Sequence, residues 1–173
     1  LHEDFVRDKD SVSSISLMAE IAAWAKDKGM TMYQMLQDIY IKYGYSKEKG
    51  ISVVRKGKSG AEEIVAMMKN FRENPMKELG GSPVILIKDY ASLEATDVVN
   101  ATKSKLDMPV TSNVLQYFSA DGSKVSIRPS GTEPKIKFYI EVRGIKMDNY
   151  ADYDAANAAA DAKIEAIKKE LGI

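Results

Sequence analysis

The stretch "NVLQYFSADGSKVSIRPSGTEPKIKFYIEV", residues 113–142, decides the fold of this chain. Two strand-like runs flank Asp121-Gly122, a dipeptide that favours a hairpin because glycine adopts a positive φ without steric cost. After a second turn, every other residue from Ile136 to Val142 is apolar. This alternation predicts a strand with one face in the core and one polar face. The stretch therefore predicts three consecutive antiparallel strands.

The flanking segments predict the rest of this unit. We expect strands over residues 51–57 and 84–90, a helix that begins at Ser59 with Glu62 as its capping partner, and a final helix over 153–171 that ends at Gly172. Residues 74–83 contain loop-forming residues, and the mostly polar residues 91–112 predict an irregular loop. The predicted fold class is α+β, a mainly antiparallel sheet with helices on one face.

Two helices are predicted before this unit. The apolar-rich segment from Ser11 to Lys28 predicts a largely buried helix, capped by Asp10 or Ser11 and ended by Gly29. Thr31 and Gln34 have the spacing of a capping box for a second helix, over 31–43. The composition changes near residues 45–50. We therefore predict two parts, residues 1–46 and residues 47–173.

Composition excludes several classes of function. Lys and Arg together equal Asp and Glu at 25 each, so no overall field attracts nucleic acid or an acidic membrane. Without cysteine there are no disulfides or thiolate metal sites, and a single histidine builds no histidine cluster. No apolar run reaches the roughly 20 residues of a membrane span. We expect a cytoplasmic protein that binds neither nucleic acid nor membranes.

The second turn, "RPSGTEP" at residues 128–134, has the composition of an anion site. Arg128 offers a planar fork that can bind two phosphate oxygens, and Ser130 and Thr132 add hydroxyl groups. A turn through Gly131 can direct successive backbone N–H groups into one concavity. Lys135 follows directly on the polar face of the next strand. The alternative is an ordinary surface turn, because the same residue types also form turns without a ligand.

Lys137 and Lys124 extend the predicted positive region. Lys137 lies two residues beyond Lys135, and Lys124 shares a face with Arg128 if their strand is regular. Asp121-Gly122-Ser123 is interpreted as a turn and not as a metal loop, because hard cations need several oxygen ligands. No metal site is predicted in this chain.

The motif "RPSGTEPKIKFY" resembles the phosphate-binding loop in the C-terminal domain of the α-D-phosphohexomutase superfamily, the phosphoglucomutases and phosphomannomutases. "FVRDKDSV", residues 5–12, resembles a segment near the end of that family's third domain. The order of the two motifs also agrees with the family. The resemblance implies that the chain is a C-terminal fragment, with a TATA-binding-protein-like final domain preceded by two helices from the end of the third domain.

The resemblance also implies site residues. Arg128, Ser130, Gly131 and Thr132 match residues that hold the non-reacting phosphate of the substrate, with Lys135 as an outer contact. Lys9, and more weakly Arg7, match residues of the family that reach the substrate. The implied reaction moves phosphate between positions 1 and 6 of a hexose phosphate through a phosphoserine, with Mg²⁺ and a hexose 1,6-bisphosphate intermediate.

The family's phosphorylated serine, magnesium loop and sugar-recognition loop have no match in this chain. We therefore expect the isolated chain to have no catalytic residues and no activity, and to depend on missing N-terminal domains. Two alternatives stay open: a free-standing phosphate-binding or regulatory module, and a phosphopentomutase-type member of the same family. The apolar N-terminal helices further predict self-association through an exposed face.

Overall fold

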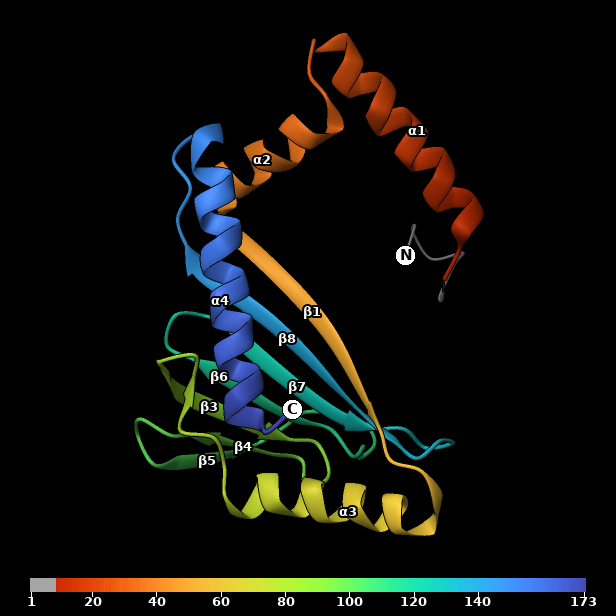
Figure 1. Ribbon diagram of the computed structural model, residues 1–173, viewed down its shortest axis with the longest axis vertical. Helices are drawn as coiled ribbons and strands as arrows, with labels where there is room; N and C mark the ends of the chain where they lie inside the picture. Colours follow the sequence, from red (N-terminus) through yellow and green to blue (C-terminus); the bar gives the residue numbers. More distant parts are fainter. Residues whose placement is uncertain (1–8) are drawn as a thin grey trace.

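The computed structural model describes residues 9–173, which form a curved antiparallel sheet with helices packed on it and two further helices at one end (Figure 1). The elements in chain order are α1 (Ser11–Asp27), α2 (Met32–Tyr43), β1 (Tyr45–Val54), α3 (Gly57–Glu73), β2 (Glu78–Leu79), β3 (Ser82–Asp89), β4 (Glu94–Asp97), β5 (Thr102–Lys105), β6 (Leu115–Ser119), β7 (Lys124–Pro129), β8 (Lys135–Ile145), the 3₁₀ turn η1 (Tyr150–Asp152) and α4 (Tyr153–Leu171).

The sheet has the strand order β1-β8-β7-β6-β3-β4-β5, with β2 paired to β3. All these pairs are antiparallel. Strands β6 and β7 form the predicted hairpin, and Gly122 has the predicted positive φ, 83°. Strand β8 is the predicted long strand, and it lies between β7 and β1. The predicted three-strand unit is therefore confirmed.

Both α3 and α4 cover the same face of the sheet, as predicted. The rings of Phe71 on α3 and Phe138 on β8 meet edge to face, with centroids 6.0 Å apart. The Tyr117 hydroxyl donates a 2.6 Å hydrogen bond to the Phe71 carbonyl. The apolar face of α4 supplies the other large part of the core: Ala156, Ala160, Ile164, Ile167 and Leu171. The opposite face of the sheet has no helix over it in the described residues, and the polar residues of β7 and β8 lie there.

Residues 91–112 contradict the prediction of an irregular loop, because β4 and β5 form a small hairpin within them. Asp97 starts its turn by accepting hydrogen bonds from the Val99 and Asn100 amides, each 2.9 Å. Leu93 and Ala101 take positive φ, which glycine usually supplies. Strand β5 is exposed along its whole length, so no apolar alternation marked it in the sequence.

The boundaries of β1 and α3 also differ from prediction. Strand β1 begins at Tyr45 instead of residue 51, because its first half consists of polar residues that pair with β8. Helix α3 begins at Gly57 and not at Ser59, and its N-cap Lys56 makes no side-chain capping bond. The predicted Ser59–Glu62 capping box is therefore wrong.

The N-terminal helices have the predicted caps but not the predicted burial. Asp10 caps α1, and Thr31 and Gln34 form the capping box of α2. Helix α1 is largely exposed, with Val12 and Ile15 at 75% and 70%, because it projects away from the sheet beyond α2 (Figure 1). The prediction of a largely buried helix is therefore wrong for the described residues. Self-association through this face stays a prediction.

A cluster of tyrosines joins α2 to the sheet. Tyr40 on α2 packs on Tyr45 of β1 with ring centroids 4.7 Å apart, and Tyr33 meets Tyr153 edge to face at 5.3 Å. Burial raises the pKa of Tyr45 to about 12. The predicted division at residues 46 and 47 stays a prediction. In the described part of the chain, no helix has the length and apolarity to cross a bilayer.

The Asp121 carboxylate ties the β6–β7 hairpin to α4. It accepts hydrogen bonds from Lys163, from the Ser119 hydroxyl at 2.7 Å and from the Ser123 amide at 3.1 Å. Partial burial raises the pKa of Asp121, but these three donors outweigh it and hold the pKa well below its usual range. The carboxylate is therefore a structural group of this turn.

Replacing Asp121 with Asn should lower the free energy of unfolding by about 2 kcal/mol at neutral pH, because hydrogen bonds to a charged group are lost. The stabilisation exists above the ordinary aspartate pKa and disappears as pH falls through the lowered one. Urea unfolding at several pH values measures both effects. The matched control is Asp148→Asn, because Asp148 pairs with Lys146 on the surface. An equal loss of unfolding free energy in both variants would contradict a structural role for the Asp121 carboxylate.

Candidate functional site

The predicted phosphate residues of the second turn lie together between two neighbouring strands. Arg128 is near the end of β7, Lys135 begins β8, and the connecting residues 130–134 are called the β7–β8 turn below. Lys9 is exposed just before α1, outside this turn. Arg7 lies outside the described residues. The hairpin of β7 and β8 thus brings five of the seven predicted residues together: Arg128, Ser130, Gly131, Thr132 and Lys135.

Backbone donors converge on the Ser130 side chain. The Ser130 hydroxyl oxygen accepts from the Thr132 amide at 3.4 Å and from the Glu133 amide at 3.3 Å. Both bonds are long, so they hold their donors weakly. The Ser130 amide closes the turn by donating to the Lys135 carbonyl at 2.8 Å. The turn therefore directs two weakly held N–H groups toward the Ser130 hydroxyl, and an anion that took the place of this acceptor would meet both donors.

Gly131 leaves open space at the tip of this turn. Its φ is outside the left-handed region, and a Cβ built on it meets no described atom within 4 Å. The fold therefore does not require glycine here, either for backbone conformation or for packing. A glycine in such a place removes the side chain from the side where a ligand can approach the backbone.

Two cations stand next to each other beside the turn. Arg128 and Lys137 are direct cross-strand partners on β7 and β8, on the open face of the sheet. Directly opposed like charges destabilise an antiparallel pair. Among the described residues, no carboxylate lies within ion-pair distance of either side chain. Lys137 was not among the predicted site residues, because only the strand register shows that it faces Arg128.

Lys135 differs from Arg128 and Lys137 in that the Glu133 carboxylate forms an ion pair with it. The hydrogen bond and charge of Lys135, with a smaller contribution from the charge of Lys137, lower the pKa of Glu133. Lys135 is therefore partly neutralised within the turn. An anion that enters the turn competes with Glu133 for this lysine.

The predicted contribution of Lys124 is reduced by its partners. Lys124 shares the open face with Arg128, as predicted, but its ammonium forms a 2.7 Å ion pair with Glu141. Arg143 also pairs with Glu141. Partial burial raises the pKa of Glu141, but the hydrogen bonds from these two cations lower it overall. The unpaired positive charge therefore lies at the Arg128 end of the strands.

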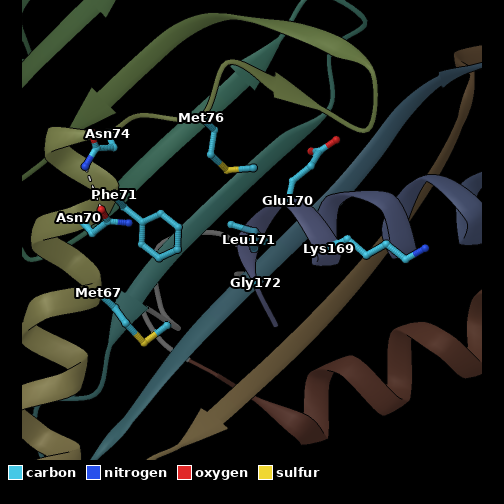
Figure 2. A pocket seen from close by; sticks show the side chains of 9 residues that line it. All are labelled: Met67, Asn70, Phe71, Asn74, Met76, Lys169, Glu170, Leu171 and Gly172. Atoms are coloured by element: carbon cyan, nitrogen blue, oxygen red, sulfur yellow. Dashed lines mark hydrogen bonds between the residues drawn. The ribbon is translucent and has the colours of Figure 1, made fainter.

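A pocket of about 330 Å³ lies elsewhere, between the C-terminal ends of α3 and α4 (Figure 2). Met67, Phe71, Met76 and Leu171 form its apolar lining, and Lys169 and Glu170 stand at its rim. Figure 1 shows that the β7–β8 turn lies at the opposite, N-terminal end of α3. Within the described residues, no group of three or more His, Cys, Asp or Glu side chains is arranged to hold a metal ion.

Comparisons with known proteins show similarity to phosphoglucomutases over much of the chain. Residues 86–147 match the family model described as "Phosphoglucomutase/phosphomannomutase, C-terminal domain". A phosphoglucomutase of Staphylococcus aureus strain MRSA252 is 36% identical over 151 residues, which cover 87% of this chain and 27% of the relative. That of Staphylococcus haemolyticus is 33% identical over 150 residues, 87% of this chain and 26% of the relative. The chain thus spans about a quarter of the length of these relatives.

A solved structure also resembles the chain. It is the open form of the exocytosis-sensitive phosphoprotein pp63/parafusin, a phosphoglucomutase from Paramecium, with 18% identity and a TM-score of 0.49. The superposition covers 98% of this chain and 29% of that chain.

Replacing Lys135 with Met should raise the pKa of Glu133 toward that of an ordinary glutamate, because the hydrogen bond and the nearer positive charge are lost. Carboxyl ¹³C shifts followed during an acid titration measure this change. Lys124→Met is the control, since Lys124 pairs with Glu141 and not with Glu133. An unchanged Glu133 titration in Lys135→Met would show that the ion pair does not form in solution.

Proposed function

We propose that the chain, which matches the phosphoglucomutase/phosphomannomutase C-terminal domain over residues 86–147, is the C-terminal, phosphate-binding part of such an enzyme. The whole enzyme would transfer phosphate reversibly between positions 1 and 6 of a hexose phosphate through a phosphoserine. The present residues would bind the phosphate that does not react. Arg128, Ser130, Gly131, Thr132 and Lys135 are the proposed contacts, and we add Lys137.

The proposal rests on the arrangement of hydrogen-bond donors and cations in the β7–β8 turn. The amides of Thr132 and Glu133 converge there on the Ser130 hydroxyl. Beside them stand Arg128 and Lys137, with no carboxylate within ion-pair distance among the described residues. A dianionic phosphate would accept from these donors and would relieve the repulsion between Arg128 and Lys137. A neutral sugar supplies neither effect. The site therefore favours a phosphate group over the sugar that carries it.

Such a site contributes to catalysis by orientation. Binding the remote phosphate provides free energy away from the reacting atoms, and that free energy positions the other end of the substrate for in-line transfer. Because the donors contact phosphate and not sugar, the same turn can accept the phosphate at position 1 or at position 6. This suits a hexose 1,6-bisphosphate that reverses its orientation between two transfer steps.

The resemblance also implies Mg²⁺, which would stabilise the transferring phosphoryl group. The described residues do not fit that ion, because the proposed site is cationic and no cluster of carboxylates is present among them. We therefore assign Mg²⁺ to no residue of this chain. Lys9 stays a proposed substrate contact from the end of the preceding domain, together with Arg7. A cytoplasmic location and the absence of nucleic-acid and membrane partners are also proposals.

Glucose 1-phosphate should shift the amide resonances of residues 128–135, with a dissociation constant of about 1 mM for a single phosphate contact. Glucose is the ligand control. Gly131→Ala should keep the native unfolding midpoint, because its Cβ has open space, but should weaken phosphate binding if the anion approaches that space. Titrations of both proteins followed by ¹H–¹⁵N spectra measure this.

The matched control variant is Gly50→Ala, because Gly50 is also exposed with open space around it and lies on β1. Equal responses to glucose and glucose 1-phosphate would exclude a phosphate site in this turn. Unchanged affinity in Gly131→Ala would show that the anion does not approach Gly131.

A coupled assay with glucose 1-phosphate should show no turnover by the isolated chain. The reason is that the proposed site binds a phosphate that does not react, and the nucleophile and Mg²⁺ would come from the missing N-terminal domains. Measurable turnover, abolished by Arg128→Ala, would contradict this and would favour a complete catalytic unit. A free-standing phosphate-binding module would bind glucose 1-phosphate without turnover even when the full natural protein is assayed. A phosphopentomutase-type enzyme would prefer pentose phosphates.

A further inference from the structure

The β7–β8 turn is held by a backbone hydrogen bond from a distant part of the chain. The Arg55 amide donates to the Pro134 carbonyl at 2.9 Å. Arg55 directly follows β1, whose last residue, Val54, pairs with Lys135 on β8. The bond therefore continues the β1–β8 ladder by one residue into the turn. The position of Arg55 thus helps to set the position of the turn.

The first turn of α3 holds Arg55 in place. Gly60, in that turn, is buried against the Arg55 backbone. A Cβ on Gly60 would overlap the Arg55 carbonyl carbon and oxygen and would lie 2.8 Å from the Arg55 Cβ. These are mostly backbone atoms, so they cannot yield by a change of rotamer. The φ of Gly60 is outside the left-handed region, so glycine is needed here for space alone.

Helix α3 cannot easily move away from this contact. Ile64, Met68 and Phe71 fix the helix in the core of the sheet, and close-packed cores resist displacement. The Arg55 side chain also returns to the helix, where its Nε lies 3.2 Å from the Glu63 carboxylate. An added Cβ at Gly60 would therefore displace Arg55, and Arg55 would carry Pro134 with it.

We propose that Gly60 and the Arg55 backbone are positioning residues for the phosphate site. They set the β7–β8 turn through the bond from Arg55 to Pro134, so that the donors near Ser130 converge before a ligand arrives. The inference rests on the proposed function for its ligand. Gly60 has no side chain and is buried, so its effect on an anion must pass through its neighbours, and the Arg55 atoms are the nearest of these.

The first experiment uses Gly60→Ala and a titration with glucose 1-phosphate. We expect the affinity to fall by about fivefold or more, the lower range of typical coupling between linked sites. The ligand-free spectrum should also show displaced amide resonances at Glu133 and Lys135. Gly50→Ala, on β1, is the control for a glycine with open space around it. Arg55→Ala keeps the amide donor and loses the Glu63 ion pair, so it should retain most of the affinity.

A core variant separates positioning from general stability. Ile167→Val should destabilise the core through lost packing but leave the phosphate affinity unchanged, because Ile167 lies on α4 and not on the helix that holds Arg55. Native affinity and native turn resonances in a folded Gly60→Ala chain would overturn the proposal. An equal loss of affinity in Ile167→Val would also overturn it, because stability alone would then explain the effect.

A second measurement keeps the test independent of whether Gly60→Ala folds. In the native chain, saturating glucose 1-phosphate should slow hydrogen exchange of the Arg55 amide, because coupling between two sites is reciprocal. Unchanged Arg55 exchange under saturation would overturn the proposal. If glucose 1-phosphate does not bind at all, the proposed function fails. The amide resonances of Glu133 and Lys135, compared between ligand-free Gly60→Ala and the native chain, then still decide whether Gly60 positions the turn.

Discussion

The pairing of β8 with β7 on one side and β1 on the other is the interaction on which this structure depends. Its register places Ile136, Phe138 and Ile140 against α3 and α4, and Lys135 and Lys137 on the opposite face. Because side chains alternate with a period of two, a slip by one residue would exchange these faces and bury the lysines. The same register therefore sets both the core and the charge distribution of the proposed site.

The cations on the open face of the sheet differ in whether a carboxylate forms an ion pair with them. Glu141 forms ion pairs with Lys124 and Arg143 at one end of β8, and Glu133 holds Lys135 within the turn. Arg128 and Lys137 stay opposite each other with no carboxylate within ion-pair distance among the described residues, although the charge of Lys137 helps to lower the pKa of Glu133. The repulsion between them is small in water and is relieved by a bound anion. A chain with equal numbers of acidic and basic residues thus has a local positive site, which its net charge does not reveal.

The proposed site also depends on elements that contribute no ligand contact. Helix α3 fixes Arg55, and Arg55 fixes the Pro134 end of the turn. At the other end of the sheet, Tyr40 and Tyr45 attach α2 to β1. The turn is therefore positioned by the packed body of the sheet and not by its own residues alone. Such preorganisation reduces the ordering cost that binding would otherwise carry.

The sequence by itself determined the three-strand unit, the final helix, the caps of α1 and α2, and the residue types of the proposed anion site, because all of these depend on local periodicity and turn chemistry. It could not predict β4 and β5, because an exposed polar hairpin has no apolar alternation. It also could not predict the exposure of α1, because an apolar helix does not specify what it packs against. Only the tertiary structure placed Lys137 opposite Arg128 and brought Gly60 against Arg55. These contacts join residues from different elements, and their positions follow from strand register and helix packing, which no local pattern encodes.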